Sequence, residues 1–438
     1  MKALNTRLVR VWREPHLRWT AIAVAVGLVL RLVWVGVASR EPVGLADPLR
    51  YLEAARGIAS GDGYREFLSG EPTAYYPPGY PYFLGAVVWL ARHTPLTDDA
   101  VLLAGVCQAL IGAATVALSA VLARRLLGPG AGVATAVIIA LYPNLIFHSA
   151  ALLSETLFIA LFVAALLVLR WRPWDGGIGW AHLAGFGALF GVAVLVRPVV
   201  LAVVPALAVV WWLDSHDVRT TLRRLAVSGV VVVAVVAPWT VRNAVRLDAF
   251  VPISTNTGDN FCIGHEPGAQ GGFALTEACA TGESTADGVA AEVRHDDEVT
   301  ERAWRYLGEN LDREPWLLWR RALITLDSDH DALAAVQSFG EDPFIAERTE
   351  SLLSALADGA WYLVAATGLA GSFALASRRR PDRLLVVLAA AATLAVPLLF
   401  FGDPRFKVPA VPLIAIAASV VFAHAGTLGH RVAPTDRG

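Results

Sequence analysis

Residues 100–170 read AVLLAGVCQALIGAATVALSAVLARRLLGPGAGVATAVIIALYPNLIFHSAALLSETLFIALFVAALLVLR, and this stretch decides the fold. It contains three apolar segments, at 100–123, 131–148 and 153–170. Each has a length that suits a membrane-spanning helix, which needs about 17–25 predominantly apolar residues. Arg124 and Arg125 follow the first segment and Arg170 ends the third, as expected if basic residues of short loops stay in the cytoplasm. The stretch therefore predicts an all-α polytopic membrane protein.

The composition of the whole chain supports this interpretation. Of 438 residues, 56% are hydrophobic and 17% are charged, and the mean hydropathy is +0.54. A soluble core cannot bury so many apolar side chains, so lipid must act as the solvent. The formal charge of -2 gives no electrostatic support for a nucleic-acid partner. The ten histidines form no HExxH motif and the glycine runs follow no strand pattern, so we expect no metal and no required cofactor.

The same criteria applied along the chain predict about ten spanning helices. They lie at 18–38, 100–123, 131–148, 153–170, 180–197, 198–213, 225–241, 355–376, 384–401 and 408–426. Five basic clusters then share one side of the membrane: Arg7, Arg10, Arg13 and Arg18; Arg124 and Arg125; Arg170 and Arg172; Arg219, Arg223 and Arg224; and Arg378, Arg379, Arg380 and Arg383. This pattern predicts a multi-pass plasma-membrane protein with both termini in the cytoplasm.

Two long segments are then outside the cytoplasm. The first outer loop, 39–99, contains a short apolar segment at 79–91 that we expect to lie along the membrane surface, because an extra span would invert every later loop. The second, 242–354, reads as an extracytoplasmic cap with short helices. We accordingly divide the chain into a catalytic module (1–241), this cap, and three C-terminal helices with a short tail (355–438). Cys262 and Cys279 lie in the cap, but their spacing leaves both a disulfide and two free thiols open.

Three ionisable residues beside or within apolar segments need an explanation. Asp47 precedes Pro48 just beyond the first span, and a simple helix N-cap would account for it. Glu155 opens an apolar helix, where an acid that compensates the helix dipole is the simpler interpretation. Arg197 has apolar residues on both sides, so it must reach the interface, pair with an anion or line a polar cavity.

Further basic and aromatic residues map to the same outer face. Arg242, Arg405 and Lys407 lie at outer helix ends, where each alone could be a boundary anchor. Taken together with Asp47, Glu155 and Arg197, they suit a reaction that deprotonates a hydroxyl and stabilises a departing phosphate. We therefore predict catalytic carboxylates at Asp47 and Glu155 and a donor-phosphate site at Arg197, Arg242, Arg405 and Lys407. The predicted substrate cleft comprises Tyr51, Tyr76, His148 and Asn243, with Tyr75 and Tyr80 nearby.

These motifs resemble the GT-C superfamily of polyprenyl-phosphate-sugar-dependent glycosyltransferases, which includes protein O-mannosyltransferases and the lipid A aminoarabinose transferase. The resemblance rests on ADPLRYLEAARGIASGDGY, YYPPGYP, LLSETLF, GVAVLVRP, the run that begins APWTVRNAVRLDAF, and DPRFKVPAVP. It implies a GT-C-like bundle whose first outer loop forms juxtamembrane helices and carries the catalytic carboxylate, here Asp47. Several relatives have two adjacent acids in that loop, whereas Pro48 follows Asp47, so the sequence does not support a divalent metal.

The expected activity is an inverting glycosyl transfer on the outer face of the membrane. The resemblance implies a polyprenyl-phosphate-linked sugar as donor and a hydroxyl of a protein, lipid or cell-envelope glycan as acceptor. A transporter or flippase of an anionic lipid-linked substrate is the alternative, since charges inside membranes also mark transport pathways. Transporters often place their sites near the midplane between repeated halves, and this sequence has neither repeats nor midplane acids.

Overall fold

The computed structural model describes residues 14–44, 46–95, 99–174, 177–274, 276, 278–279, 289–339, 343–377 and 379–429. Helices dominate the described part, and the only strand-like pairings there are the isolated bridges Arg65–Pro72 and Gly272–Gly402. The elements are α2 (Pro15–Ala38), α3 (Asp47–Ser60), α4 (Gly79–His93), α5 (Ala100–Leu127), α6 (Pro129–Leu141), α7 (Pro143–Phe147), α8 (Glu155–Leu169), α9 (Trp180–Val196), η2 (Pro198–Val203), α10 (Val204–Ser215), α11 (Val218–Leu247), α12 (Thr257–Gly264), α13 (Val289–Glu309), η4 (Leu311–Arg313), α14 (Glu314–Leu326), α15 (Asp331–Gln337), α16 (Glu347–Leu375), α17 (Pro381–Leu399), η5 (Pro404–Ala410) and α18 (Val411–Gly429). The predicted all-α architecture is confirmed.

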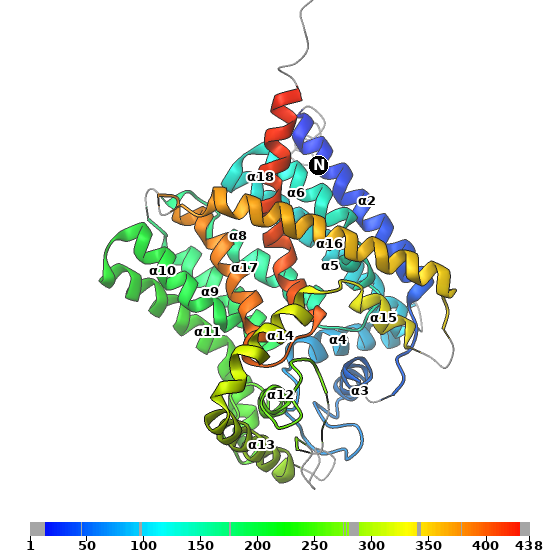
Figure 1. The fold of residues 1–438 in the computed structure, drawn as a ribbon. Helices are drawn as coiled ribbons and strands as arrows, with labels where there is room; N and C mark the ends of the chain where they lie inside the picture. The colour runs from blue at the N-terminus through cyan, green and yellow to red at the C-terminus, as the bar shows by residue number, and fades with distance from the viewer. Residues whose placement is uncertain are drawn as a thin grey trace, which may run out of the picture.

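Seven helical segments among the described residues are long and apolar enough to span a membrane. They are α2, α5, η2 with α10, α11, α16, α17, and η5 with α18. The shorter apolar helices α6, α8 and α9 occupy the three other predicted positions, so the total of ten spans stays a prediction. The first residues of α2 and the last residues of α18 both lie at the top of the bundle (Figure 1). Arg7, Arg10, Arg13, Arg378 and both chain ends lie outside the described residues, and the cytoplasmic termini also stay a prediction.

The short helix α6 ends at a break, and the carbonyl groups left there without helical partners accept hydrogen bonds from a side chain of α2. Tyr142 ends α6 just before Pro143, whose ring prevents the helix from continuing and leaves the last carbonyl groups of α6 without helical partners. Arg31, which lies within α2 and is only 1% exposed, donates to the carbonyl groups of Ile139 and Ala140 at 3.2 and 3.4 Å. A guanidinium inside a spanning helix is therefore used to cap a neighbouring helix.

The first outer loop folds into two packed helices, as expected. α3 is seen end-on in Figure 1, crosswise to most of the bundle, and it packs against α4. α4, which contains the 79–91 segment, also contacts α5 and α9 at the lower end of the bundle. The first residue of α4, Gly79, lies so close to α9 that a Cβ atom there would come within 2.6 Å of Val196. The loop is thus held directly against the residue that precedes Arg197.

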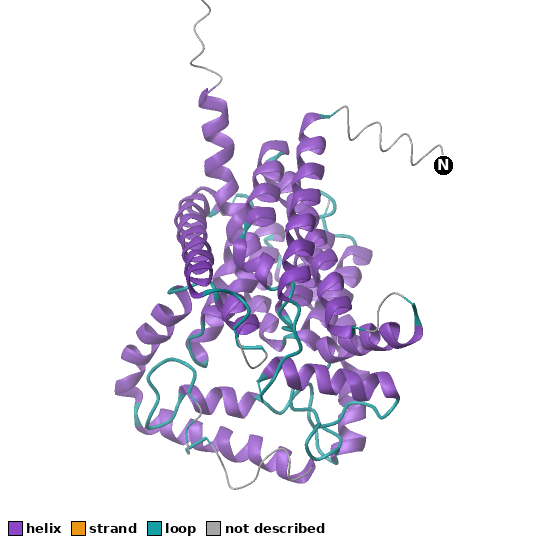
Figure 2. Cartoon of the chain, turned by 90° about the vertical axis from the view of Figure 1, so that its right-hand side faces the viewer, coloured by secondary structure: helices purple, strands orange, loops and turns teal. Residues whose placement is uncertain are grey.

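The cap consists of α12, α13, α14 and α15, of which α12 and α13 lie below the bundle (Figure 1). Figure 2 shows that this part of the chain, like the bundle, is built of helices and loops. Its helices are not all short, because α13 has 21 residues. The flanking helices extend further than predicted, with α11 ending at Leu247 and α16 beginning at Glu347, and α16 crosses the bundle obliquely (Figure 1). Cys262 and Cys279 form a disulfide with a Cα–Cα distance of 5.7 Å, which resolves the question that their spacing left open.

Candidate active site

Asp47 and Glu155 are joined by one guanidinium group. Arg405 donates through Nη1 to Asp47 Oδ2 at 2.8 Å, and through Nε and Nη2 to the two oxygens of Glu155. Tyr76 donates to the other oxygen of Asp47 at 2.8 Å. The structure therefore brings together two acids, one arginine and one tyrosine that are widely separated in the sequence.

Arg197 completes this cluster as the second guanidinium group on Glu155. Its Nη1 donates to Glu155 and to the hydroxyl of Ser154, the latter at 3.2 Å. The side chain of Glu155 is fully buried, whereas those of Arg197, Arg405 and Asp47 are 13%, 19% and 33% exposed. Two guanidinium groups share the buried carboxylate of Glu155, and one of them also pairs with Asp47, which is the acid that solvent or a substrate can reach.

The side chains of this cluster contact one another and do not cap the helices on which they lie. The alternative interpretation of Asp47 as a helix N-cap does not hold: α3 begins at Asp47, its N-cap is Ala46, and no side chain caps that end. Pro48 stands at an early helical position, where its missing N–H costs nothing. Ser154 is the N-cap of α8, but its side chain makes no cap bond and accepts from Arg197. The Asp47 carboxylate is thereby left available to Tyr76 and Arg405.

The segment that carries Arg405 is itself tightly constrained. The carboxylate of Asp403 accepts from the backbone N–H of Arg405 at 2.8 Å and caps η5. Gly402 pairs with Gly271 and has no room for a side chain, because a Cβ atom would lie 2.5 Å from the carbonyl oxygen of Arg321. These contacts hold the start of η5 against α14, so that the guanidinium of Arg405 meets both acids.

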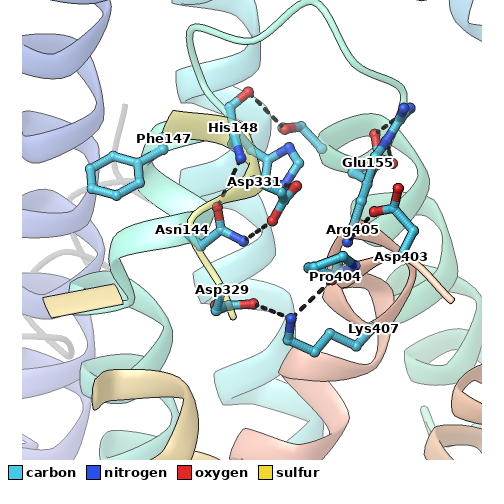
Figure 3. A network of polar contacts seen from close by, with 12 residues as sticks. Asn144, Phe147, His148, Glu155, Asp329, Asp331, Asp403, Pro404, Arg405 and Lys407 are labelled. Atoms are coloured by element: carbon cyan, nitrogen blue, oxygen red, sulfur yellow. Dashed lines mark hydrogen bonds and ion pairs between the residues drawn. The ribbon is translucent and has the colours of Figure 1, made fainter. Parts of the chain in front are cut away.

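A second polar network lies next to this cluster and contains two further predicted residues (Figure 3). Lys407 is fully buried and pairs with Asp329 at 3.1 Å. His148, which is 1% exposed, lies with Nε2 3.3 Å from Asp331, and Asn144 donates to the other oxygen of Asp331 at 2.7 Å. Lys407 and His148 thus contact acids at or just before the start of α15. Neither contacts Asp47.

Arg242 and Asn243 join the end of α11 to two loops. Arg242 donates to the carbonyl oxygens of Thr73 and Tyr64 at 2.8 and 2.7 Å, and its guanidinium lies over the ring of Trp239. Asn243 is fully buried and donates to the carbonyl of Val251 at 3.0 Å. In this structure both residues bind backbone. The structure does not bring them to the cluster around Glu155.

The predicted tyrosines form a packed wall beside Asp47. The ring of Tyr51 meets those of Tyr76 and Tyr80 edge to face, with centroids 5.0 and 5.1 Å apart. Tyr80 donates to Gln108 at 2.9 Å, and Gln108 donates in turn to carbonyl groups just before α8. Burial and the negative charge of Asp47 raise the pKa of Tyr76 well above its usual value, so Tyr76 remains a hydrogen-bond donor to Asp47.

The cap is attached to the first outer loop through a buried acid that the sequence did not single out. Glu292 of α13 accepts from the hydroxyl of Thr73 at 2.6 Å, the N–H of Ala74 at 2.9 Å and the hydroxyl of Thr255 at 2.7 Å. Burial raises the pKa of Glu292, and these three hydrogen bonds oppose the shift. Thr73 and Ala74 immediately precede Tyr75 and Tyr76, so the cap fixes the segment that reaches Asp47.

Removal of this carboxylate is expected to loosen the cap. A Glu292→Ala variant leaves the buried N–H of Ala74 and two hydroxyl groups without their acceptor, at about 1–3 kcal/mol for each unsatisfied group. We expect a lower melting temperature and faster proteolysis at residues 61–78. Glu301→Gln on the same helix is the matched control, because that side chain is 76% exposed. Equal melting temperatures for the two variants would contradict the assigned role.

A chain of side chains also connects the cap with Tyr75. His295 Nε2 lies 2.6 Å from Asp259 Oδ1, and Tyr75 donates to Asp259 Oδ2 at 2.6 Å. The ring of Tyr75 packs edge to face on that of Tyr76, with centroids 4.8 Å apart. The bond with Asp259 raises the pKa of His295 above its ordinary value, despite partial burial. When His295 is protonated, its contact with Asp259 is a charge-assisted hydrogen bond.

This pair makes the attachment of the cap sensitive to pH. Because the folded-state pKa of His295 is raised, its stabilisation is present below about pH 6.5 and is lost as the pH rises through that raised value. Burial raises the pKa of the neighbouring Asp296 to about 6, so titration of Asp296 changes the stability of the protein at a lower pH than titration of His295 does. Between about pH 6.5 and 8.5, we expect the melting temperature to fall more steeply for the wild type than for His295→Gln. His93→Gln, at an exposed histidine, should retain the wild-type slope.

The donor set of the cluster does not suit a metal ion. Within the described ranges, no group of three or more His, Cys, Asp or Glu side chains is arranged to hold one. Both carboxylates of the cluster already accept from arginine, whose positive charge would repel a cation.

Two pockets of about 400 and 440 Å³ stand out, and neither includes Asp47 or Glu155 in its lining.

Comparison with known proteins gives one family match. Residues 76–241 match the family model described as dolichyl-phosphate-mannose-protein mannosyltransferase. The matched range contains Tyr76, Glu155 and Arg197, whereas Asp47 and Arg405 lie outside it. No curated protein matches the chain.

Solved structures share its fold over almost its whole length. ArnT from Cupriavidus metallidurans bound to undecaprenyl phosphate has a TM-score of 0.56 at 18% identity, and the match covers 94% of this chain and 62% of that chain. The apo oligosaccharyltransferase from Archaeoglobus fulgidus has a TM-score of 0.56 at 15% identity, with coverages of 98% and 53%. AglB from the same organism, in complex with an inhibitory peptide and a dolichol-phosphate, has a TM-score of 0.53 at 14% identity, with coverages of 98% and 53%.

The chain therefore spans between about half and three fifths of the length of these structures. At such identities the likeness shows the fold, and the predicted GT-C fold is confirmed. The chain is a structural relative of membrane glycosyltransferases.

Proposed function

We propose that this chain, which has the GT-C fold, transfers a sugar from a polyprenyl-phosphate donor to an acceptor hydroxyl. The observation that carries the proposal is the shared guanidinium of Arg405, which contacts Asp47 and Glu155 at once. It places the accessible carboxylate of Asp47 next to a guanidinium group. A glycosyl transfer from a lipid phosphate requires both, since one group must accept a proton while another stabilises a departing anion.

Asp47 is the proposed general base. The acceptor oxygen attacks the anomeric carbon, the bond from that carbon to the phosphate oxygen breaks, and the acceptor proton passes to Asp47. Tyr76 and Arg405 each contact one oxygen of the Asp47 carboxylate and so fix its direction. Attack from the face opposite the leaving group inverts the anomeric centre.

Arg197 and Arg405 are the proposed phosphate-binding residues. A guanidinium group presents several donors in a planar fork that matches phosphate, and both side chains retain partial exposure. Glu155 is fully buried between them, so we assign it the role of positioning the two arginines. Arg242 and Lys407 are not assigned to the phosphate, because their donors are directed to backbone carbonyls and to Asp329.

The dimensions of the bundle suit a donor that is anchored in lipid. α8 has 15 residues, a length of about 22 Å, whereas the hydrocarbon core of a bilayer is about 30 Å thick. A cluster at the start of so short a helix would lie below the outer headgroup plane, where the phosphate of a membrane lipid can reach it. ArnT was solved with undecaprenyl phosphate and AglB with a dolichol-phosphate, which supports the same donor class.

The disulfide supports an extracytoplasmic site. Disulfides form and persist outside the cytosol, and the bond between Cys262 and Cys279 lies in the part of the cap whose Asp259 accepts from Tyr75 of the first outer loop. We therefore place the reaction on the outer face of the plasma membrane, where nucleotide sugars are not expected. The acceptor is a hydroxyl of a protein, lipid or envelope glycan on that side.

The test is a transfer assay with the purified full-length protein. A radiolabelled polyprenyl-phosphate sugar is incubated with envelope acceptors, and the label in the acceptor and the free polyprenyl phosphate are both measured. Transfer predicts that the two products rise together. Intact donor that crosses reconstituted vesicles would instead support a flippase and contradict the proposal. Mass spectrometry of envelope glycans from cells that lack the protein would identify the missing sugar and its acceptor.

A further inference from the structure

A polar pocket of about 440 Å³ lies at the end of the bundle opposite the acid–arginine cluster. α8 runs from Glu155 in that cluster to Leu169, and the next residue, Arg170, lines the pocket. The other walls come from the end of α10 and the start of α17, helices that pack against each other. The length of α8 separates the pocket from the cluster by about 22 Å, so it is a separate site.

The charges in this pocket leave a positive excess. Its ionisable lining residues are Arg170, Asp214, His216, Arg379, Arg380 and Asp382. Asp382 accepts from both Arg170 and Arg380, at 3.0 and 3.2 Å. The second acid, Asp214, is paired at 2.7 Å with an arginine of α11, Arg224. Each acid is thus neutralised by at least one guanidinium, and the exposed Arg379 forms no ion pair with any described residue.

Exposed tryptophans mark the depth of this end of the bundle in a membrane. Trp171 follows α8, Trp180 begins α9 and Trp212 lies in the last turn of α10, and they are 49%, 74% and 48% exposed. Tryptophan concentrates at the level of the lipid headgroups, because its ring is apolar and its N–H needs a polar partner. These three residues therefore place the pocket at headgroup depth.

We propose that the pocket binds the phosphate of an anionic lipid of the adjacent leaflet. Basic pockets between helix ends at the membrane surface suit such headgroups, and guanidinium groups suit phosphate. The volume falls in the range of ligand sites, about 300–1,000 Å³. Arg379 and Arg380 are exposed and supply the contacts from the side of the membrane, whereas Arg170 is buried and supplies charge from within.

Native mass spectrometry of the full-length protein in detergent tests this assignment. The protein is titrated with phosphatidylglycerol and, separately, with phosphatidylcholine, and the bound fraction is counted. We expect tighter binding of phosphatidylglycerol, and a loss of about fivefold in affinity for each arginine removed in Arg379→Gln and Arg379→Gln/Arg380→Gln, which corresponds to about 1 kcal/mol per residue. Arg348→Gln, at an exposed arginine in the first turn of α16, is the matched control and should bind as the wild type does.

Each other outcome overturns the assignment. Equal binding of the two lipids, or unchanged binding in the arginine variants, would contradict a built headgroup site. Inorganic phosphate is the second arm: if it stabilises the protein against heat in an arginine-dependent manner and displaces the lipid, the site takes free phosphate. Both substituted side chains are exposed, and an unchanged melting temperature shows that the variants fold. Since the readout is binding, it does not depend on the proposed transferase activity.

Discussion

Exchange of Asp47 for Asn is expected to reduce the rate of sugar transfer by about 10²–10⁴-fold, the contribution of a positioned general base. An amide cannot accept the acceptor proton, although it can still receive the hydrogen bond from Tyr76. Donor binding should persist, because Arg197 and Arg405 remain. The measurement is the initial rate of label transfer from a polyprenyl-phosphate sugar, together with donor affinity.

Glu41→Gln is the matched control for this variant. Glu41 is an acid of the same outer loop, but it is 57% exposed and pairs with Arg56. Its exchange should leave the rate within about twofold of the wild type, because exposed ion pairs contribute little. Wild-type transfer by the Asp47→Asn protein would exclude Asp47 as the base.

Loss of Arg405 is expected to affect both activity and stability. In Arg405→Gln, the fully buried Glu155 keeps only Arg197 as an ion-pair partner, and breaking a buried pair costs about 3–5 kcal/mol. The loss of a donor to the departing phosphate should lower the transfer rate by about 10²–10³-fold. Both effects are measured on one preparation, by thermal unfolding and by the transfer assay.

A double variant separates the two effects. Arg405→Gln/Glu155→Gln also removes the buried negative charge that has lost one of its two partners, so it should recover part of the melting temperature that Arg405→Gln loses, whereas transfer should stay low. Arg405→Lys preserves charge without the planar fork and cannot contact Asp47 and Glu155 in the same way. Recovery of activity together with stability in the double variant would mean that Arg405 acts only through folding.

The sequence predicted the fold and the central residues of the candidate site. Both follow from apolar segments of spanning length and from the ionisable residues beside them, which are energetically costly without a partner. Apolar segments of spanning length identify the helices, and acids or arginines at their ends require a partner. That requirement singled out Asp47, Glu155, Arg197 and Arg405, which the structure brings together. The structure does not place Arg242 in that cluster, although its sequence context resembles that of Arg405. What separates the two arginines is a tertiary contact, namely the carbonyl groups of Thr73 and Tyr64.

The hydrogen-bond partners of two other residues cannot be predicted from periodicity or composition. Arg31 lies in an apolar run, and its partners are carbonyl groups freed by a helix break more than a hundred positions away. Glu292 is one of many acids in a hydrophilic segment, and only its three buried donors distinguish it. In both cases the partner is backbone or a small hydroxyl, which leaves no trace in charge pattern or spacing.

The hydrogen bonds of Glu292 with Thr73 and Ala74 limit how the cap can be exchanged between related proteins. A chimera that imports residues 248–346 from a relative would bring an acid evolved for one loop against the donors of another. The smallest exchangeable unit is therefore discontinuous, and it comprises residues 61–78 together with that segment. A change in the cap at Glu292 is therefore expected to require a matching change in the loop segment that presents Tyr76 to Asp47.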